Sequence, residues 1–154
     1  MYDNKKISVD FQEVEQLKRN LYSYEFLKKQ IRILYMDKIA DINAKLGGLS
    51  KKNQEINKGG KSSAKVYQDK KNSLITEKTK IEKDMLDSVA YKVTSQIDNT
   101  LQKLSDSDKE LIREKFFYEK SYGDIAKELF ISKSVVIDRV GSVLRKMVKI
   151  TKSL

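Results

Sequence analysis

The chain contains no cysteine, no histidine and no proline, and each absence excludes a class of structure or chemistry. Without cysteine and histidine there is no disulfide, no thiol nucleophile and no histidine base, and the usual soft metal ligands are missing. Without proline, and with six glycines in 154 residues, a turn-rich β-fold is disfavoured. We therefore predict an all-α protein that is not an enzyme, with no catalytic residues, no metal site and no cofactor.

Long apolar runs are also missing. No segment approaches the roughly 20 apolar residues that a membrane-spanning helix needs. The first ten residues lack the apolar core of a signal peptide. These two absences, together with the lack of disulfides, favour a cytoplasmic protein without a membrane partner.

What the chain does have is positive charge, with 32 Lys and Arg against 22 Asp and Glu and a net charge of +10. Such a surplus favours polyanionic partners, nucleic acid first and acidic membrane surface second. The alternative is biased codon usage, because 27 of the basic residues are lysine and an AT-rich genome encodes lysine readily. The same two interpretations apply to the lysine-rich stretch 51–71, which is either a nucleic-acid contact or a solvated surface.

Apolar residues recur at spacings of three, four or seven along two long segments, which is typical of amphipathic helices. The spacing predicts a helix over about residues 9–46, interrupted at most once, and a second over about residues 64–101. Gly47-Gly48 is expected to end the first helix, and the polar stretch 47–63 is expected to be a flexible loop. The first apolar stripe is Leu17, Leu21, Tyr24, Ile31, Tyr35 and Ile42, widened by Leu27, Leu34 and Ile39; the second is Val66, Leu74, Ile81, Met85, Val89, Val93, Ile97 and Leu101, with Lys70 as a polar gap.

These two helices are expected to fold back on each other as an antiparallel, coiled-coil-like hairpin over residues 1–101. A two-helix hairpin has a thin core. We therefore expect it either to form a homodimer or to pack on the C-terminal part.

The remaining residues, 102–154, predict a second domain of three shorter helices. Ser105 can cap the first, and a second helix is expected over about residues 122–129, with the small Ala126 where two helices cross. Phe130-Ile131 is expected to form a tight turn, and Ser132 to cap a final helix over about residues 133–149. The expected buried side of that helix is Val136, Val140, Val143, Leu144 and Met147, and residues 133–152 carry six basic side chains against one acidic.

The stretch from Leu104-Ser-Asp-Ser-Asp-Lys-Glu-Leu-Ile through Ser121-Tyr-Gly-Asp-Ile-Ala-Lys-Glu-Leu-Phe-Ile-Ser-Lys-Ser-Val-Val to Leu144-Arg-Lys-Met resembles region 4 of bacterial sigma factors. The resemblance covers about fifty residues and implies a helix-turn-helix that binds double-stranded DNA. Nothing before Leu104 is similar to the promoter-melting region 2. In layout, the chain resembles small phage late-gene regulators of the ArpU and RinA type, which implies a bacterial host cell as its location.

Carried over by position, the resemblance implies that Ser132 caps the recognition helix and contacts phosphate. It implies further that Lys133, Ser134 and Ile137 face bases, with Asp138 and Arg139 at the groove edge. Val135 and Ile137 stand where sigma factors often carry polar residues, so these two side chains either read thymine methyl groups or are buried. The full set of candidate DNA-binding residues is Tyr122, Ser132, Lys133, Ser134, Val135, Ile137, Asp138, Arg139, Arg145, Lys146 and Lys149.

The leading hypothesis is a sequence-specific transcription regulator, which the resemblance implies to be a phage or mobile-element late-gene activator with RNA polymerase as a further partner. Two alternatives remain. Small terminase subunits, which package phage DNA, also combine a helix-turn-helix with long helices, although they usually carry the helix-turn-helix first. A protein that binds polymerase without DNA is the other.

Overall fold

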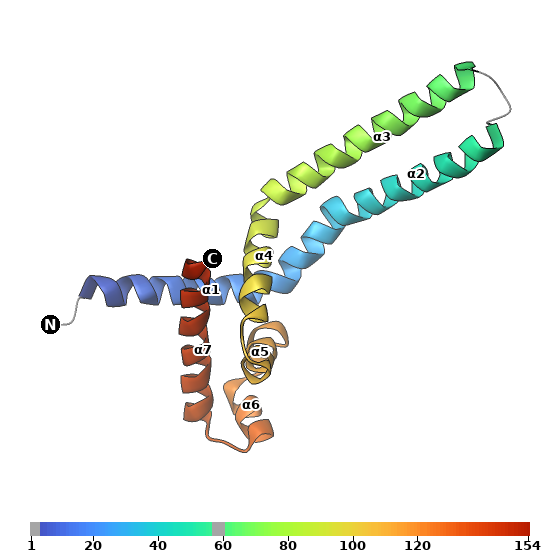
Figure 1. Ribbon diagram of the computed structural model, residues 1–154. Coiled ribbons are helices and arrows are strands. Elements are labelled where there is room, and N and C mark those ends of the chain that lie inside the picture. The colour runs from blue at the N-terminus through green and yellow to red at the C-terminus, as the bar shows by residue number, and fades with distance from the viewer. Residues whose placement is uncertain (1–3, 57–60) are drawn as a thin grey trace. The chain divides into compact units, whose positions relative to one another are not determined.

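The computed structural model describes the backbone of residues 4–56 and 61–154, and the side chains of residues 11–52 and 64–154 (Figure 1). Every regular element in these ranges is helical, and no strand is present in them, which confirms the all-α prediction. No helix among the described residues is long and apolar enough to cross a membrane. The elements are α1 (Asn4–Ile31), the π-helical turn η1 (Arg32–Met36), α2 (Asp37–Ile56), α3 (Lys61–Asp87), α4 (Val89–Gln102), α5 (Asp106–Ile112), the π-helical turn η2 (Arg113–Phe117), α6 (Tyr122–Leu129) and α7 (Lys133–Ser153).

The chain divides into two compact units whose boundaries differ from the expected one at residue 101/102. One unit consists of Met1–Leu27 together with Val93–Leu154, and the other of Lys28–Lys92. The difference arises because Leu21 of α1 and Ile97 and Leu101 of α4 belong to the same apolar core as the C-terminal helices. We call the first unit the C-terminal unit and the second the arm.

The core of the C-terminal unit is built from side chains of α1, α4, α5, η2, α6 and α7. Leu21, Ile112, Val136, Leu144 and Met147 have no exposed surface. Burying an apolar side chain of this size contributes about 1.5–3 kcal/mol, so each of these five residues stabilises the unit substantially. The other core members are Ile97, Leu101, Leu104, Leu111, Phe116, Ile125, Ala126, Val140 and Val143.

Two aromatic contacts join α1 to η2 within this unit. The Tyr24 ring stacks on Phe117 with centroids 4.5 Å apart and 14° between planes. The Tyr22 ring meets Phe116 edge to face at 4.9 Å. The Tyr24 hydroxyl also donates a hydrogen bond to the Asp98 carboxylate on α4. Tyr24 is half-buried by these contacts, whereas Tyr22 keeps 46% of its surface exposed.

We expect Tyr24 to make the C-terminal unit sensitive to alkaline pH. Burial, and then the hydrogen bond to Asp98, raise the pKa of Tyr24 above its ordinary value of 10.0. The folded chain therefore keeps this proton above pH 10.0, whereas the unfolded chain releases it. The stabilisation from Tyr24 is fully present below pH 10.0 and is lost as the pH rises toward the folded-state pKa. Above pH 10, the free energy of unfolding measured with urea should fall more steeply with pH for the wild type than for Tyr24→Phe. Equal slopes for the two proteins would contradict this.

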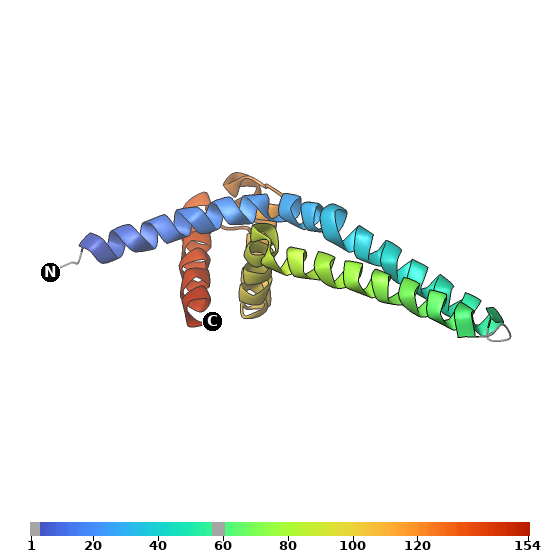
Figure 2. The ribbon, with the colours of Figure 1, turned by 90° about the horizontal axis from the view of Figure 1, so that it is seen from above.

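The arm is formed chiefly by α2 and α3, which lie side by side in both views (Figures 1 and 2). Ile31 and Ile42 are its buried side chains, and Leu46, Leu49 and Leu74 are half-buried. Three members of the predicted stripes are at least half exposed: Leu34 (50%), Val66 (54%) and Val89 (76%). The arm therefore has a narrow apolar seam.

Both long predicted helices are interrupted. The first contains the turn η1, in agreement with one expected break, and the second is broken at Ser88. The Ser88 hydroxyl donates to the Met85 carbonyl at 2.7 Å and accepts from the Tyr91 amide at 3.1 Å. A serine side chain that bonds to the backbone in this way competes with the helix, so the predicted continuous helix over 64–101 is wrong at Ser88.

The expected end of the first helix at Gly47-Gly48 is also wrong. Helix α2 runs through both glycines to Ile56, and α3 begins at Lys61, so most of the predicted loop 47–63 is helical. Residues 57–60 lie outside the described part. An interior glycine costs a helix about 1 kcal/mol relative to alanine. The half-buried Leu46 and Leu49, which flank the glycines on the seam with α3, offset that cost.

We expect Gly47→Ala to stabilise the arm by about 1 kcal/mol, because alanine has the highest helix propensity. A Cβ atom at Gly47 would meet no heavy atom within 4 Å, so the methyl group fits without strain. Ala44→Gly, at an exposed position of the same helix, is the matched control and should lose a similar amount. Thermal unfolding followed by far-UV circular dichroism measures both. A lower Tm for Gly47→Ala would show that position 47 is not helical.

Candidate nucleic-acid interface

Helices α6 and α7 begin at serine caps. The Ser121 hydroxyl accepts a hydrogen bond from the Asp124 amide, and the Ser132 hydroxyl accepts one from the Val135 amide at 3.3 Å. The bounds of α6, Tyr122–Leu129, coincide with the predicted ones. Helix α7 begins at Lys133 as predicted and continues past residue 149 to Ser153. Its last turn carries Lys152, whose ammonium lies 2.8 Å from the Glu13 carboxylate of α1.

A three-residue turn, Phe130 to Ser132, joins the two helices where the sequence predicts a tight turn. Phe130 adopts left-handed backbone angles, φ 56° and ψ 40°. The Ile131 amide donates to the Ala126 carbonyl at 3.1 Å, which closes the end of α6. Ala126 is buried, as expected for a small residue at a helix crossing, and Leu129 at the end of α6 is half exposed.

We expect Phe130→Gly to stabilise the C-terminal unit. Left-handed angles cost a non-glycine residue about 1–2 kcal/mol, and the Phe130 side chain is 94% exposed, so glycine removes strain and little packing. The greater freedom of glycine in the unfolded chain offsets about 0.5–1 kcal/mol of that gain. The net expectation is a small rise in Tm in differential scanning calorimetry. A fall of several degrees would mean that the Phe130 ring packs against the protein.

The five side chains predicted to form the buried side of α7, Val136 to Met147, are all buried. The opposite face is therefore solvent-exposed along the whole helix. We call it the outer face, and it consists of Ser134, Asp138, Arg145 and Lys149. Lys133 is exposed at the start of the helix. Gly141 lies under this face, where a Cβ atom would come 3.4 Å from an Nη atom of Arg145, so the missing side chain leaves room for the guanidinium.

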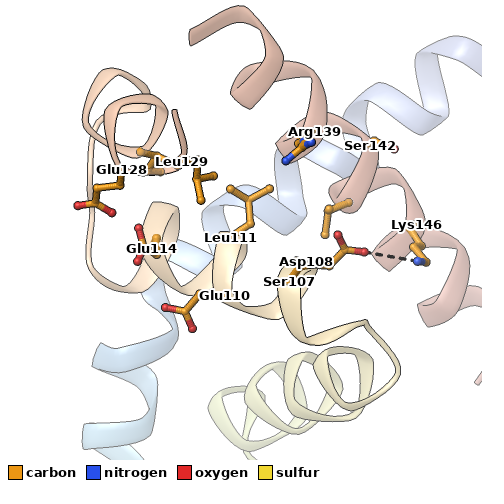
Figure 3. Close-up of a pocket in the computed structure, with 12 residues that line it drawn as sticks. Ser107, Asp108, Glu110, Leu111, Glu114, Glu128, Leu129, Arg139, Ser142 and Lys146 are labelled. Carbon is orange, nitrogen blue, oxygen red and sulfur yellow. Dashed lines mark hydrogen bonds and ion pairs between the residues drawn. The ribbon is translucent and has the colours of Figure 1, made fainter. Parts of the chain in front are cut away.

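Arg139 and Lys146 were predicted to contact DNA, but they lie on a different side of α7. Both line a cavity of about 500 Å³ between α5, α6 and α7. Figure 3 shows Arg139 facing Leu111 and Leu129 across it, with Lys146 next to Asp108. The Lys146 ammonium is 3.5 Å from the Asp108 carboxylate. These two cations are therefore separated from the outer face, and Lys146 is already paired with an acid.

The two apolar residues near the start of α7 are partly exposed. Val135 is 39% and Ile137 is 42% exposed, so neither is buried in the core. Their contact with thymine methyl groups remains a prediction. Tyr122, the other apolar candidate, is half-buried, and the Lys115 ammonium lies 4.2 Å from its ring centroid. Its ring is thus held by a cation–π contact within the protein.

The ion pairs of Lys120 near α6 could not be predicted from the neighbouring residues in the sequence. The Lys120 ammonium bridges Glu128 of α6 at 3.1 Å and Glu114 of η2 at 3.2 Å. Hydrogen bonds to Glu128 and then to Glu114 raise the pKa of Lys120 above its ordinary value. The hydrogen bond from Lys120 lowers the pKa of Glu128. The bridge fixes the entry to α6, but the spacings of six and eight residues do not indicate it in advance.

The charge along the final helix is strongly positive, with six basic residues and one acidic residue from Lys133 to Lys152. Among the residues that the structure describes, no group of His, Cys, Asp or Glu is arranged to hold a metal ion. No protein family, curated protein or solved structure matches the chain in comparisons with known proteins.

Proposed function

We propose that this protein is a sequence-specific DNA-binding transcription regulator, and that α6 and α7 act as its helix-turn-helix. The outer face of α7 enters the major groove, with Lys133 and Ser134 near base edges at the start of the helix. Arg145 and Lys149, about three and four turns further along, neutralise backbone phosphates. Asp138 lies between these groups on the same face, where a carboxylate can accept a hydrogen bond from cytosine N4.

The observation that carries this proposal is the exposed, basic outer face of a helix that begins at Ser132 after a three-residue turn. One side of α7 is fully packed in the core. On its exposed side, Arg145 and Lys149 form no ion pair with the described residues.

The proposal is tested by measuring the affinity of the protein for duplex fragments of its own genomic neighbourhood at two salt concentrations. A regulator should bind one fragment at least about 10³-fold more tightly than the others. That preference should persist at the higher salt, although all affinities fall as counterions are released. Equal affinity for every fragment, with release at higher salt, would contradict sequence-specific binding.

The cavity of Figure 3 supports a second proposed activity, contact with another protein. Its lining includes the apolar side chains of Leu111, Ile125 and Leu129. Its carboxylates are largely paired, because Asp108 contacts Lys146, and Glu114 and Glu128 contact Lys120. An apolar side chain of RNA polymerase would complement this surface. Leu129→Glu should abolish the retention of purified RNA polymerase by the immobilised protein while leaving DNA affinity unchanged; unchanged retention would remove the cavity as the contact.

A further inference from the structure

Most of the protein's positive charge lies outside the C-terminal unit. Residues 28–92, the arm, carry 16 Lys and Arg against 8 Asp and Glu, a net +8 of the total +10. Within the arm, residues 45–71 carry eight lysines and two acids, whereas residues 72–92 are neutral, with four of each sign. The charge is therefore concentrated along the distal parts of α2 and α3, far along the chain from α7.

This basic region contains a concave site at Gly48, one of the two glycines inside α2. Gly48 lines a hollow of about 490 Å³ on the arm, together with Lys45, Lys52, Lys70 and Ser73. Leu49 and Leu74 complete it. A Cβ atom at Gly48 would meet nothing within 4 Å, so the helix backbone is open to close approach there. We call this site the α2–α3 hollow.

The three lysines of the α2–α3 hollow are exposed, and no carboxylate lines it. None of the three forms an ion pair with the residues that the structure describes. Like charges gathered around one hollow repel each other in the free protein, and an anion between them relieves that repulsion. The Ser73 hydroxyl adds a hydrogen-bond donor. The hollow thus has the chemistry of a phosphate site.

The spacing of the lysines fits an extended polyanion better than a single ion. Lys45 and Lys52 are two helical turns apart, about 10 Å along the axis of α2, and Lys70 lies opposite them on α3. Double-stranded DNA carries one negative charge per about 1.7 Å of its axis, so a duplex alongside the arm presents several phosphates to these cations at once.

We propose that the α2–α3 hollow binds the phosphate backbone of double-stranded DNA irrespective of sequence, as a second contact separate from α7. The choice of DNA as the polyanion rests on the proposed function. Once α7 holds a duplex, the arm meets that duplex or a neighbouring segment at high effective concentration. The arm then adds affinity and salt dependence, and α7 alone adds sequence preference.

The first test uses the full-length protein and a duplex of random sequence, over a salt range of about 50–200 mM. The triple variant Lys45→Gln/Lys52→Gln/Lys70→Gln should reduce the slope of log affinity against log salt by about 2–3, since each lost phosphate contact removes about 0.9. The matched control is Lys38→Gln/Lys80→Gln/Lys83→Gln, which removes the same charge from exposed positions of the arm outside the hollow. Equal slopes for the two triples would overturn the proposal.

A second pair of variants tests whether binding is localised at the hollow. The two variants carry the same net charge and change neighbouring residues of the same helix. Gly48→Glu places a carboxylate in the hollow, and Gly47→Glu places one on the neighbouring residue, which does not line it. Only Gly48→Glu should weaken binding to the random duplex, by about tenfold, the loss of roughly one charge-assisted contact. Equal weakening by both variants would contradict a localised site.

These outcomes separate the two proposals. If no genomic fragment is preferred but the hollow variants still weaken random-duplex binding, the proposed regulator function fails and the α2–α3 hollow stands. If one fragment is preferred and the two triples behave alike, the hollow fails and the function stands. Phosphatidylserine vesicles are the comparison ligand. Loss of vesicle binding in the hollow variants, with DNA binding unchanged, would assign the hollow to a membrane surface and overturn its role with DNA.

Discussion

Arg145→Ala should weaken binding to the preferred DNA fragment by about ten- to a hundredfold, because a hydrogen bond to a charged group such as a backbone phosphate is worth about 1.5–3 kcal/mol. Arg145 lies on the outer face of α7, over the space left by Gly141, and it forms no ion pair with the described residues. Arg145→Lys keeps the charge but loses the planar fork that can bind a phosphate through two hydrogen bonds, so it should restore only part of the affinity.

The matched control for this prediction is Arg139→Ala on the same helix. Arg139 faces the cavity between α5, α6 and α7 rather than the outer face (Figure 3), so its loss should change the affinity less than threefold. Fluorescence anisotropy with the preferred fragment measures both variants. A larger loss for Arg139→Ala than for Arg145→Ala would contradict the assignment of the outer face as the DNA contact.

Leu21→Ala should destabilise the C-terminal unit by about 2–5 kcal/mol, the usual cost of emptying a fully buried leucine site. Leu21 lies on α1, more than a hundred residues before α7, yet it has no exposed surface and belongs to the same core as Leu144 and Met147. The neighbouring helices relax only partly into the cavity left by the truncation. Helix α7, which shares this core, should therefore lose stability too.

Amide hydrogen exchange on α7 measures this effect directly. In Leu21→Ala, the slowly exchanging amides of Val140 to Met147 should lose protection by several orders of magnitude, in proportion to the lost free energy. Leu34→Ala, at a half-exposed position of the arm, is the control and should leave them unchanged. Unchanged protection in Leu21→Ala would mean that α1 does not contribute to the core around α7.

Elements with strong local signals could be predicted from the sequence. Ser105 and Ser132 are predicted caps and both accept the hydrogen bond of a capping residue, and the predicted start residues of α6 and α7 agree with the structure. The buried stripe of α7 follows from its 3.6-residue period alone. The all-α class follows from the same periodicity and from the lack of proline.

Features that depend on distant residues could not be predicted. The continuation of α2 through Gly47-Gly48 depends on its packing against α3, which a local preference for glycine at helix ends does not include. The placement of Leu21 with the C-terminal helices moves the boundary between the two units. The pairing of Lys146 with Asp108 depends on a contact 38 residues apart, which the charge and helical position of Lys146 do not indicate.

DNA cleavage by an iron chelate attached to the protein tests whether the outer face of α7 lies in a DNA groove. The chain has no cysteine, so Ser134→Cys provides a unique attachment point for an iron chelate at the exposed start of α7. Ser107→Cys, exposed on α5 at the rim of the cavity, is the control. Strand cuts from position 134 should be confined to one site in the preferred fragment, or to two sites about one helical turn apart if two copies bind. Cuts that are spread along the fragment, or that are as strong from position 107, would contradict this prediction.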